Sequence, residues 1–296
     1  MISVLIPVYN WNIHDLAIEL NHQCSDLGIE TEIIFLDDCS SQISLSQSNQ
    51  KIAESLGFKY LISDLNQGIA STLNKLANLA TYHHLIFIDA DVMPVHADFL
   101  KQYAKLNIQD KVYCGGLLYQ NQKPEIGTLR WKYGKKSEVQ SLAEANQNPH
   151  LNIKGCNFCC DKKLVLNYPF ATNIKTYSPI DTLFGLNLKA NNKEILFIEN
   201  RVYHLGLDDN ESFLNKTEIL LNGFISLGEM HPGIIQNSKL FKLYAKFDQL
   251  KLTSILKLGF KIFKPFLRKN LLSKNPSTAL FQIYKLGYLS TLKFKS

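Results

Sequence analysis

The chain has 296 residues, of which 46% are hydrophobic and 20% charged, with 15 glycines and 9 prolines. This composition excludes collagen-like and Pro/Gly-rich disordered chains. The formal net charge of +6 is unevenly distributed, because residues 239–296 contain 13 Lys and Arg and one acid, Asp248. The remaining 19 basic and 25 acidic residues belong to residues 1–238. We therefore expect an acidic catalytic-type domain at 1–238 and a basic C-terminal region at 239–296.

Apolar, strand-like runs alternate with segments of helical periodicity through the first 90 residues. The expected strands are 3–9, 31–36, 58–63 and 85–88, and the expected helices are 15–28, 46–56 and 68–80. This alternation is typical of βαβ units that build a mostly parallel sheet. Further strands are expected at 154–160 and 195–198. Ligands bind such sheets beyond the carboxyl ends of the strands, so polar residues placed there are the candidates for function.

Six cysteines are present, and Met1 leads directly into a strand-like segment without a basic leader. We therefore expect no signal peptide and reduced thiols in a cytoplasmic protein. Cys156 and Cys159 have the spacing of a metal or redox pair, but no second pair accompanies them. Buried structural thiols are the alternative that we favour.

Acidic residues follow two of the expected strands. Asp89 and Asp91 come directly after the strand 85–88, and alternate residues of an extended chain point the same way. Two such carboxylates suit a hard divalent cation that also binds substrate phosphates, although a solvated, helix-capping loop would have the same sequence. Asp37 and Asp38 follow the strand 31–36, where a carboxylate can accept hydrogen bonds from a nucleobase or ribose or can cap the next helix.

Asn66-Gln67-Gly68 precedes the helix 68–80. The glycine allows close backbone approach, and a helix N-terminus favours a phosphate. Together with Ser3–Asn10, Asp37–Ser40 and Asp89-Ala90-Asp91, this segment resembles glycosyltransferase family 2 in order and spacing. The resemblance covers roughly residues 1–238. It implies a GT-A fold, an αβα nucleotide-binding sandwich, followed here by a helical C-terminal appendage.

The resemblance also implies roles for individual residues. The nucleotide-sugar site would contain Pro7, Tyr9, Asp37, Asp38, Asn66, Gly68, Asp89 and Ala90. Asp91 of the Asp-x-Asp motif would bind Mn²⁺ or Mg²⁺, and His204, in the segment 200–206, would be a further ligand. Asp181 would be the general base that takes the proton of the acceptor hydroxyl. The acidic residue that usually precedes this base is Ile180 here.

The implied activity is inverting transfer of a sugar from a nucleotide-diphosphate sugar to a glycan or lipid-linked acceptor, in cell-surface polysaccharide synthesis. A nucleotidyltransferase is one alternative, but residues 7–10 lack its glycine- and arginine-rich phosphate loop. A non-catalytic sugar-nucleotide-binding protein is the other alternative, because of Ile180. We expect no nucleic-acid partner, since no recognised binding motif accompanies the basic residues.

The basic region has the pattern of an amphipathic helix. Lys257, Lys261, Lys264 and Arg268 follow helical spacing, and apolar residues from Leu252 to Phe266 fill other positions. Pro265 predicts two short helices rather than one. Such a segment suits an anionic membrane surface, which would place the enzyme peripherally on the inner face of the cell membrane. Packing of the apolar side chains on the catalytic domain is the alternative.

Overall fold

The computed structural model describes residues 1–172, 179–230, 235–236 and 238–292, and it divides into two compact units. The first unit comprises Met1–Tyr119, Val139–Thr172 and Ile180–Gly206, and the second consists mainly of Gln120–Glu138 and Leu207–Ser296. This division differs from the expected one after residue 238. The reason is that helices α5 (Thr128–Ser137) and α10 (Asn210–Met230) pack with the C-terminal helices around a separate core.

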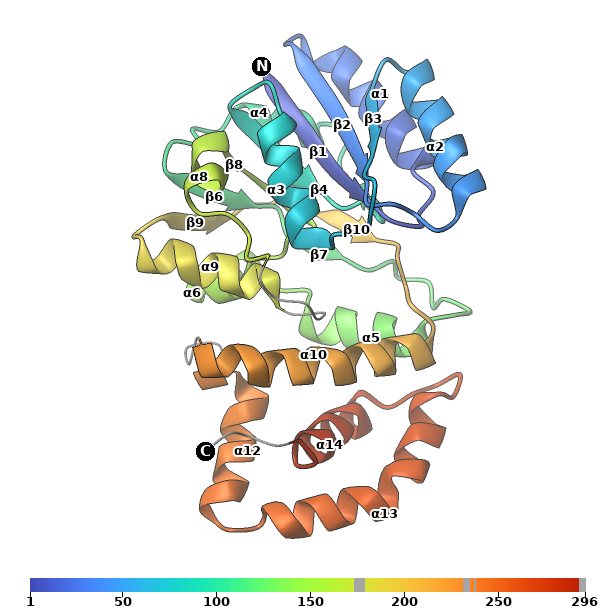
Figure 1. Cartoon of the computed structure of the whole chain (residues 1–296), viewed down its shortest axis with the longest axis vertical. Coiled ribbons are helices and arrows are strands. Elements are labelled where there is room, and N and C mark those ends of the chain that lie inside the picture. Colours follow the sequence, from blue (N-terminus) through green and yellow to red (C-terminus); the bar gives the residue numbers. More distant parts are fainter. Residues whose placement is uncertain (173–178, 231–234, 237, 293–296) are drawn as a thin grey trace. The chain divides into compact units, whose positions relative to one another are not determined.

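The first unit is built on a seven-stranded sheet (Figure 1). Its spatial order is β3 (Lys59–Ile62), β2 (Thr31–Asp37), β1 (Ile2–Val8), β4 (His84–Ile88), β8 (Asn157–Asp161), β6 (Lys111–Cys114) and β9 (Glu194–Phe197). Only β8 runs antiparallel to its neighbours, so the expected mostly parallel sheet is confirmed. A small second sheet contains β5 (Val92–Pro94), β10 (Val202–His204) and β7 (Leu117–Leu118).

Helices cover both faces of the large sheet, as the βαβ pattern predicts. Helix α1 contacts α2 and α4 on one side, whereas α3 contacts β1 and α8 on the other. The helices of this unit are α1 (His14–Leu27), α2 (Ile43–Ser55), α3 (Ile69–Leu79), α4 (Phe99–Ala104), α6 (Leu142–Gln147), α7 (Pro149–Asn152), α8 (Lys162–Asn167) and α9 (Ile180–Ala190). All seven residues of β1 are buried, which explains why its sequence is apolar throughout except for Ser3 and does not alternate.

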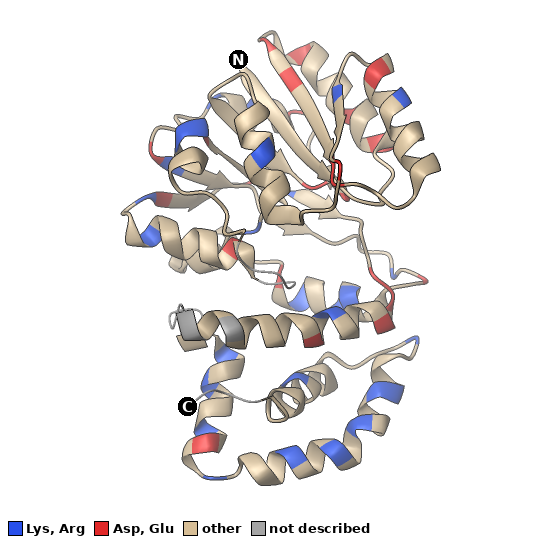
Figure 2. Cartoon of the chain, in the orientation of Figure 1, with Lys and Arg blue, Asp and Glu red and all other residues tan. Residues whose placement is uncertain are grey.

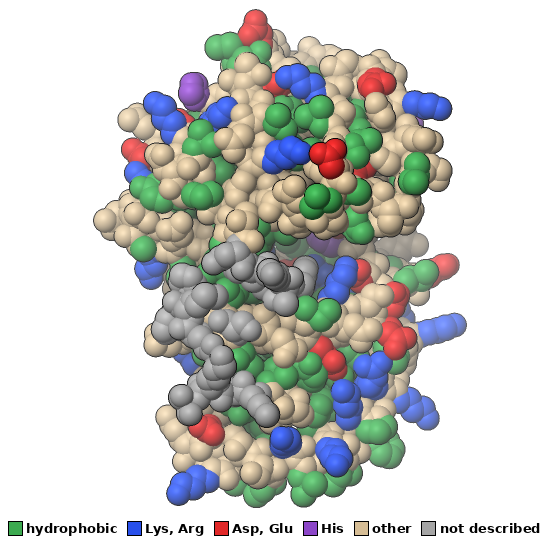
Figure 3. Space-filling view, viewed as in Figure 1, with side chains coloured by type: hydrophobic (Ala, Val, Ile, Leu, Met, Phe, Trp, Pro, Cys, Tyr) green, Lys and Arg blue, Asp and Glu red, His purple; other side chains and the backbone are tan. Residues whose placement is uncertain are grey.

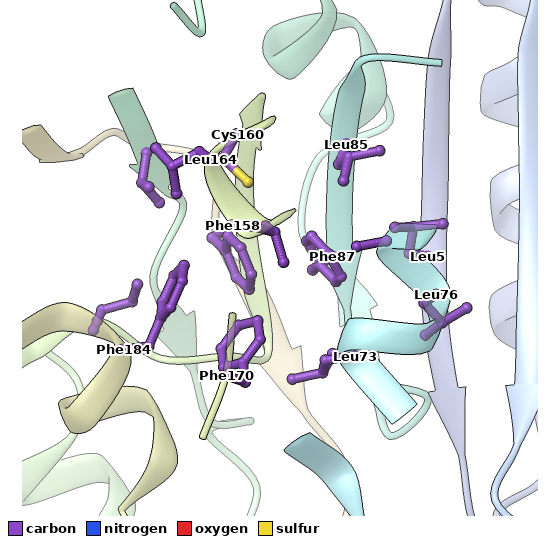
Figure 4. Close-up of a cluster of buried hydrophobic side chains, with 14 of the residues drawn as sticks. Leu5, Leu73, Leu76, Leu85, Phe87, Phe158, Cys160, Leu164, Phe170 and Phe184 are labelled. Atoms are coloured by element: carbon purple, nitrogen blue, oxygen red, sulfur yellow. The ribbon is translucent and has the colours of Figure 1, made fainter. Parts of the chain in front are cut away.

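An aromatic cluster joins α9 to the centre of the sheet (Figure 4). The Phe87 and Phe158 rings stack with their centroids 4.7 Å apart, and the Phe170 and Phe184 rings stack at 4.2 Å. All four side chains are buried, and burying a phenylalanine contributes about 1.5–3 kcal/mol to stability. Phe87 lies two residues before Asp89, and Phe184 lies one helical turn after Asp181. The cluster therefore fixes the two backbones that carry these acids.

The second unit is helical, with α12 (Lys239–Gln249), α13 (Thr253–Leu271) and α14 (Thr278–Leu289) joining α5 and α10. Its core includes Leu129, Leu214, Phe260, Leu271 and Phe281, which come from four of these helices. The expectation of two short helices around Pro265 was wrong, because α13 is a single helix. Because Pro265 has no N–H, the Lys261 carbonyl lacks its usual helical hydrogen bond. Both residues are exposed, so water can replace the missing donor.

Candidate active site

The expected ligand-binding edge lies where β1, β2 and β4 end. Val8 pairs with Asp37 across β1 and β2, and Leu5 pairs with Phe87 across β1 and β4, so the three strands end side by side. Pro7 is buried inside β1, and Tyr9 follows the strand with 51% of its surface exposed. The backbone N–H of Asn10 donates to Ser40 Oγ at 2.8 Å, which ties the loop after β1 to the loop after β2.

Asp37 does not face this edge. Its side chain is fully buried and accepts hydrogen bonds from the Ser40 N–H at 2.7 Å, Ser46 Oγ at 2.6 Å and the Tyr60 hydroxyl at 2.7 Å. Asp37 was expected in the nucleotide-sugar site, but its carboxylate is engaged by these three protein groups. Its carboxylate holds the loop after β2 and the start of α2 in place, because burial without these partners would be costly.

The side chain of Asp38 contacts the Asn66-Gln67-Gly68 segment instead. Its two carboxylate oxygens accept hydrogen bonds from the backbone N–H groups of Gln67, at 3.0 Å, and Gly68, at 2.8 Å. Gly68 has φ 83° and ψ 162°, a conformation that is essentially restricted to glycine. Asn66 is exposed beside it. Asp38 thus shapes the turn that opens α3, which explains why an acid and a distant glycine occur together in the sequence.

The Asp89-Ala90-Asp91 segment crosses from the large sheet to the small one. Asp89 donates its N–H to the Cys156 carbonyl at 3.2 Å, and the Asp91 carbonyl accepts from the N–H of Leu205 at 2.8 Å. Ala90 is buried. A Cβ atom at Gly206 would overlap Asp91 Oδ2, so the glycine leaves the space that this carboxylate occupies. Gly206 was part of the expected motif, but only the structure shows what it does.

His204 lies beside Asp91, as the resemblance implies. Strands β5 and β10 pair Val92 with His204, and this register brings His204 Nε2 to 3.7 Å from Asp91 Oδ2. The imidazole is 13% exposed and stacks on Tyr119, with the ring centroids 5.6 Å apart. Tyr119 was not expected from the sequence, since nothing in its surroundings distinguishes it from a packing residue.

Asp181 enters from the first turn of α9. Gly155 packs against it so closely that a Cβ there would be 2.8 Å from Asp181 Oδ1. Burial raises the pKa of Asp181, while a hydrogen bond from the Gly155 backbone and the charge of Lys154 oppose the rise. Ile180 is partly buried and packs against the hydrophobic core that contains the aromatic cluster.

The charges of Asp91 and Asp181 act on Asp89. Burial raises the pKa of Asp89, and the Asp91 and Asp181 carboxylates raise it further. The pKa of the Cys156 thiol is also raised, first by burial and then by Asp89, Asp181 and Asp91. Carboxyl groups from two separate segments, Asp89-Ala90-Asp91 and the start of α9, therefore lie near one buried thiol. Cys156 and Cys159 are buried, as expected for this pair, and Cys160 is buried beside them.

Two further residues have structural roles. Asn157 is buried and accepts from the Tyr103 hydroxyl at 2.6 Å while donating to the carbonyls of Gly116 and Asn200. The basic segment 130–136 lies in α5 of the second unit. There Tyr133 packs edge-on against Phe281 and belongs to the packing of the second unit's core.

Asp91 and His204 fit a divalent cation that phosphates also bind. Ligands about 2.1 Å from one ion lie at most about 4.2 Å apart, and 3.7 Å falls within that span. Among the described residues, no group of three or more His, Cys, Asp and Glu side chains could hold a metal ion. Mg²⁺ commonly takes one or two carboxylates and completes its shell with substrate phosphates and water, so two protein ligands agree with that chemistry.

The family model of glycosyl transferase family 2 matches residues 3–170. A search of curated proteins found no match. Among solved structures, the mannosyltransferase PcManGT from Pyrobaculum calidifontis, in complex with GDP-Man and Mn²⁺, has a TM-score of 0.56 at 12% identity, covering 98% of this chain and 86% of that one. S. aureus TarS 1-349 with UDP has a TM-score of 0.50 at 19% identity, covering 88% and 72%.

The glucosyl-3-phosphoglycerate synthase of Mycobacterium tuberculosis, with Mn²⁺, UDP-Glc and phosphoglyceric acid, has a TM-score of 0.50 at 14% identity, covering 75% of this chain and 77% of that one. The chain spans only 39% of the longer S. aureus TarS structure. At these identities the similarity concerns the fold. The structure has the expected GT-A fold.

Proposed function

Because the chain belongs to glycosyl transferase family 2, we propose that it transfers a sugar from a nucleotide-diphosphate sugar to a hydroxyl group of a glycan or lipid-linked acceptor, in cell-surface polysaccharide synthesis. The observation that carries this proposal is the set of contacts that brings Asp89 and Asp181 to the Gly155-Cys156 segment and Asp91 to His204, at the carboxyl edge of the parallel strands. The crystallised complexes of similar fold with GDP-Man or UDP-Glc and Mn²⁺ support the donor class.

In this proposal the donor nucleotide lies over the ends of β1 and β2. Tyr9 is exposed there and can pack against a base, and Asp38 holds the turn of Asn66 and Gly68 open to the diphosphate. The N-terminus of α3 favours a negative group at that turn. Asp91 and His204 would hold Mn²⁺ or Mg²⁺. A divalent ion there neutralises charge on the diphosphate leaving group.

Asp181 is the group that we assign to the acceptor. A carboxylate within hydrogen-bond reach of the acceptor hydroxyl takes its proton as the oxygen attacks the anomeric carbon, and such base catalysis contributes about 10²- to 10⁴-fold. Burial raises the pKa of Asp181, which makes its carboxylate a stronger base than an exposed one. One base opposite the leaving group implies in-line displacement with inversion.

The test is donor binding and turnover with a panel of UDP- and GDP-sugars, in Mn²⁺ and in EDTA. We expect Asp91→Ala to lose metal-stimulated donor hydrolysis and Asp181→Asn to bind donor normally while losing transfer. Asp26→Asn, at an exposed carboxylate of α1, is the matched control. Full turnover by Asp181→Asn would remove the assigned base. Donor binding without turnover in the wild-type chain would instead favour the non-catalytic alternative that Ile180 suggests.

A further inference from the structure

Helix α13 exposes a stripe of large apolar side chains. Ile255, Leu258, Ile262 and Phe266 recur at i, i+3, i+7 and i+11, and they are 67%, 60%, 57% and 71% exposed. Phe263 lies alongside them on the helix, 59% exposed. Scattered apolar residues on a surface need no explanation, but a continuous stripe of this size marks an interaction surface.

This stripe is not the face by which α13 packs in its own unit. That face carries Phe260, Leu267 and Leu271, which are buried in the core of the second unit. The Phe260 and Tyr284 rings meet edge to face, with centroids 5.2 Å apart. The helix is therefore held by one apolar face and presents a second one to solvent, which folding of this unit does not require.

The basic residues of α13 divide into two sets. Arg268 and Lys264 form ion pairs with Glu211, at 2.9 Å, and Glu218, at 3.5 Å, so they fasten the helix to α10. Lys257, Lys261 and Lys269 are exposed, and in the part of the chain that the structure describes they form no ion pair. The sequence of α13 contains no acid, and Figure 2 shows basic residues without acidic ones along this helix. Figure 3 shows hydrophobic and basic side chains intermingled over it.

We propose that α13 lies in the interface of an anionic lipid bilayer, with its apolar stripe among the acyl chains and Lys257 and Lys261 among the headgroup phosphates. An interfacial helix combines an apolar face with lysines on the polar side in this way. A second copy of the chain is a poorer partner, because apposed α13 helices would bring lysines together without acids to neutralise them. No helix within the described residues is long and apolar enough to cross a membrane.

Peripheral membrane association is expected for residues 239–296, and α13 would be the surface that makes the contact. This association does not depend on the transferase activity. The expected position at the inner face of the cell membrane stays a prediction. The experiment is co-sedimentation of the full chain with two kinds of vesicle. One is phosphatidylcholine alone, and the other contains roughly 30% phosphatidylglycerol, an anionic lipid. We expect binding to the anionic vesicles only, and weaker binding at high salt.

Two variants separate the contributions. Lys257→Gln with Lys261→Gln should weaken binding about 30-fold, since each lysine near such a surface contributes about fivefold. Phe263→Ser with Phe266→Ser should weaken it by more than about tenfold. The matched controls are Lys51→Gln and Ile43→Ser, at exposed positions of α2.

Circular dichroism melting checks that the variants are folded. Unchanged vesicle binding by both α13 variants, or equal binding to neutral vesicles, would overturn the proposal. So would a wild-type dimer in sedimentation that Phe266→Ser dissociates, because the stripe would then be a contact between copies.

Discussion

Replacing Asp38 by Asn tests whether this acid serves the nucleotide site by holding the turn before α3. Both carboxylate oxygens accept backbone N–H groups, and the side chain is 5% exposed. Asn keeps the shape but turns one acceptor into an NH₂ donor facing a backbone N–H. One charge-assisted hydrogen bond is lost, and a nearly buried donor is left without an acceptor. Such a loss costs about 2–3 kcal/mol.

We expect this cost to appear locally, as opening of the turn. Amide hydrogen exchange at Gln67 and Gly68 should accelerate about 30- to 150-fold, the factor that corresponds to 2–3 kcal/mol. Donor affinity, measured by calorimetry with Mn²⁺, should fall by up to the same factor, because binding must then restore the turn. Asp64→Asn, at an exposed carboxylate nearby in the chain, is the control. Unchanged exchange together with lost affinity would refute the reasoning and indicate that Asp38 contacts the nucleotide directly.

Three further predictions concern other parts of the first unit. Gly206→Ala should lower metal-dependent turnover about 10- to 100-fold, because the new methyl displaces Asp91, whereas Gly259→Ala, where a Cβ meets nothing within 4 Å, should leave turnover unchanged. In the pH profile of kcat/KM, the apparent pKa of the acid limb should lie above the ordinary aspartate pKa of 3.8, because burial raises the pKa of Asp181 and the base works as a carboxylate. The same apparent pKa in the residual activity of Asp181→Asn would contradict this assignment. Burial opposes ionisation of Glu32, but hydrogen bonds from Ser3, Lys59 and Thr81 lower its pKa from 4.5 to about 2. Because water screens these partly exposed partners, its contribution to stability is about 1–2 kcal/mol; it is complete above pH 4.5 and is lost as the pH falls toward 2. Urea unfolding should therefore show Glu32→Gln destabilised at pH 7 and nearly equal to wild type at pH 2.

The local sequence pattern was sufficient to predict the strands and helices of the first half of the sheet. The strands at Ile2–Val8, Thr31–Asp37 and His84–Ile88, and the helix at Ile69–Leu79, lie within a few residues of their expected positions. Each is a run in which apolar spacing and a flanking acid or glycine agree, so propensity and packing favour the same structure. The order of these segments also carried the family resemblance.

Pro265 and Asp37 show where local rules fail. A proline inside a helix removes one hydrogen bond, yet α13 continues because that position faces solvent while Phe260 and Leu267 anchor the helix on either side. Asp37 and Asp38 are chemically identical neighbours. Only their surroundings, Ser46 and Tyr60 for one and the turn at Gly68 for the other, give them different tasks.

By itself, the sequence determined the alternation of strands and helices, the acids at the strand ends and the concentration of positive charge after residue 238. These features depend on residues close together in the chain. The tertiary structure alone decided that Asp89, Asp91 and Asp181 lie near Cys156, that Gly155 and Gly206 make room for two of these acids, and that α13 keeps an apolar stripe exposed. Each of these depends on contacts between distant segments, or on which face of a helix a core covers, and helical spacing alone cannot tell a buried apolar face from an exposed one.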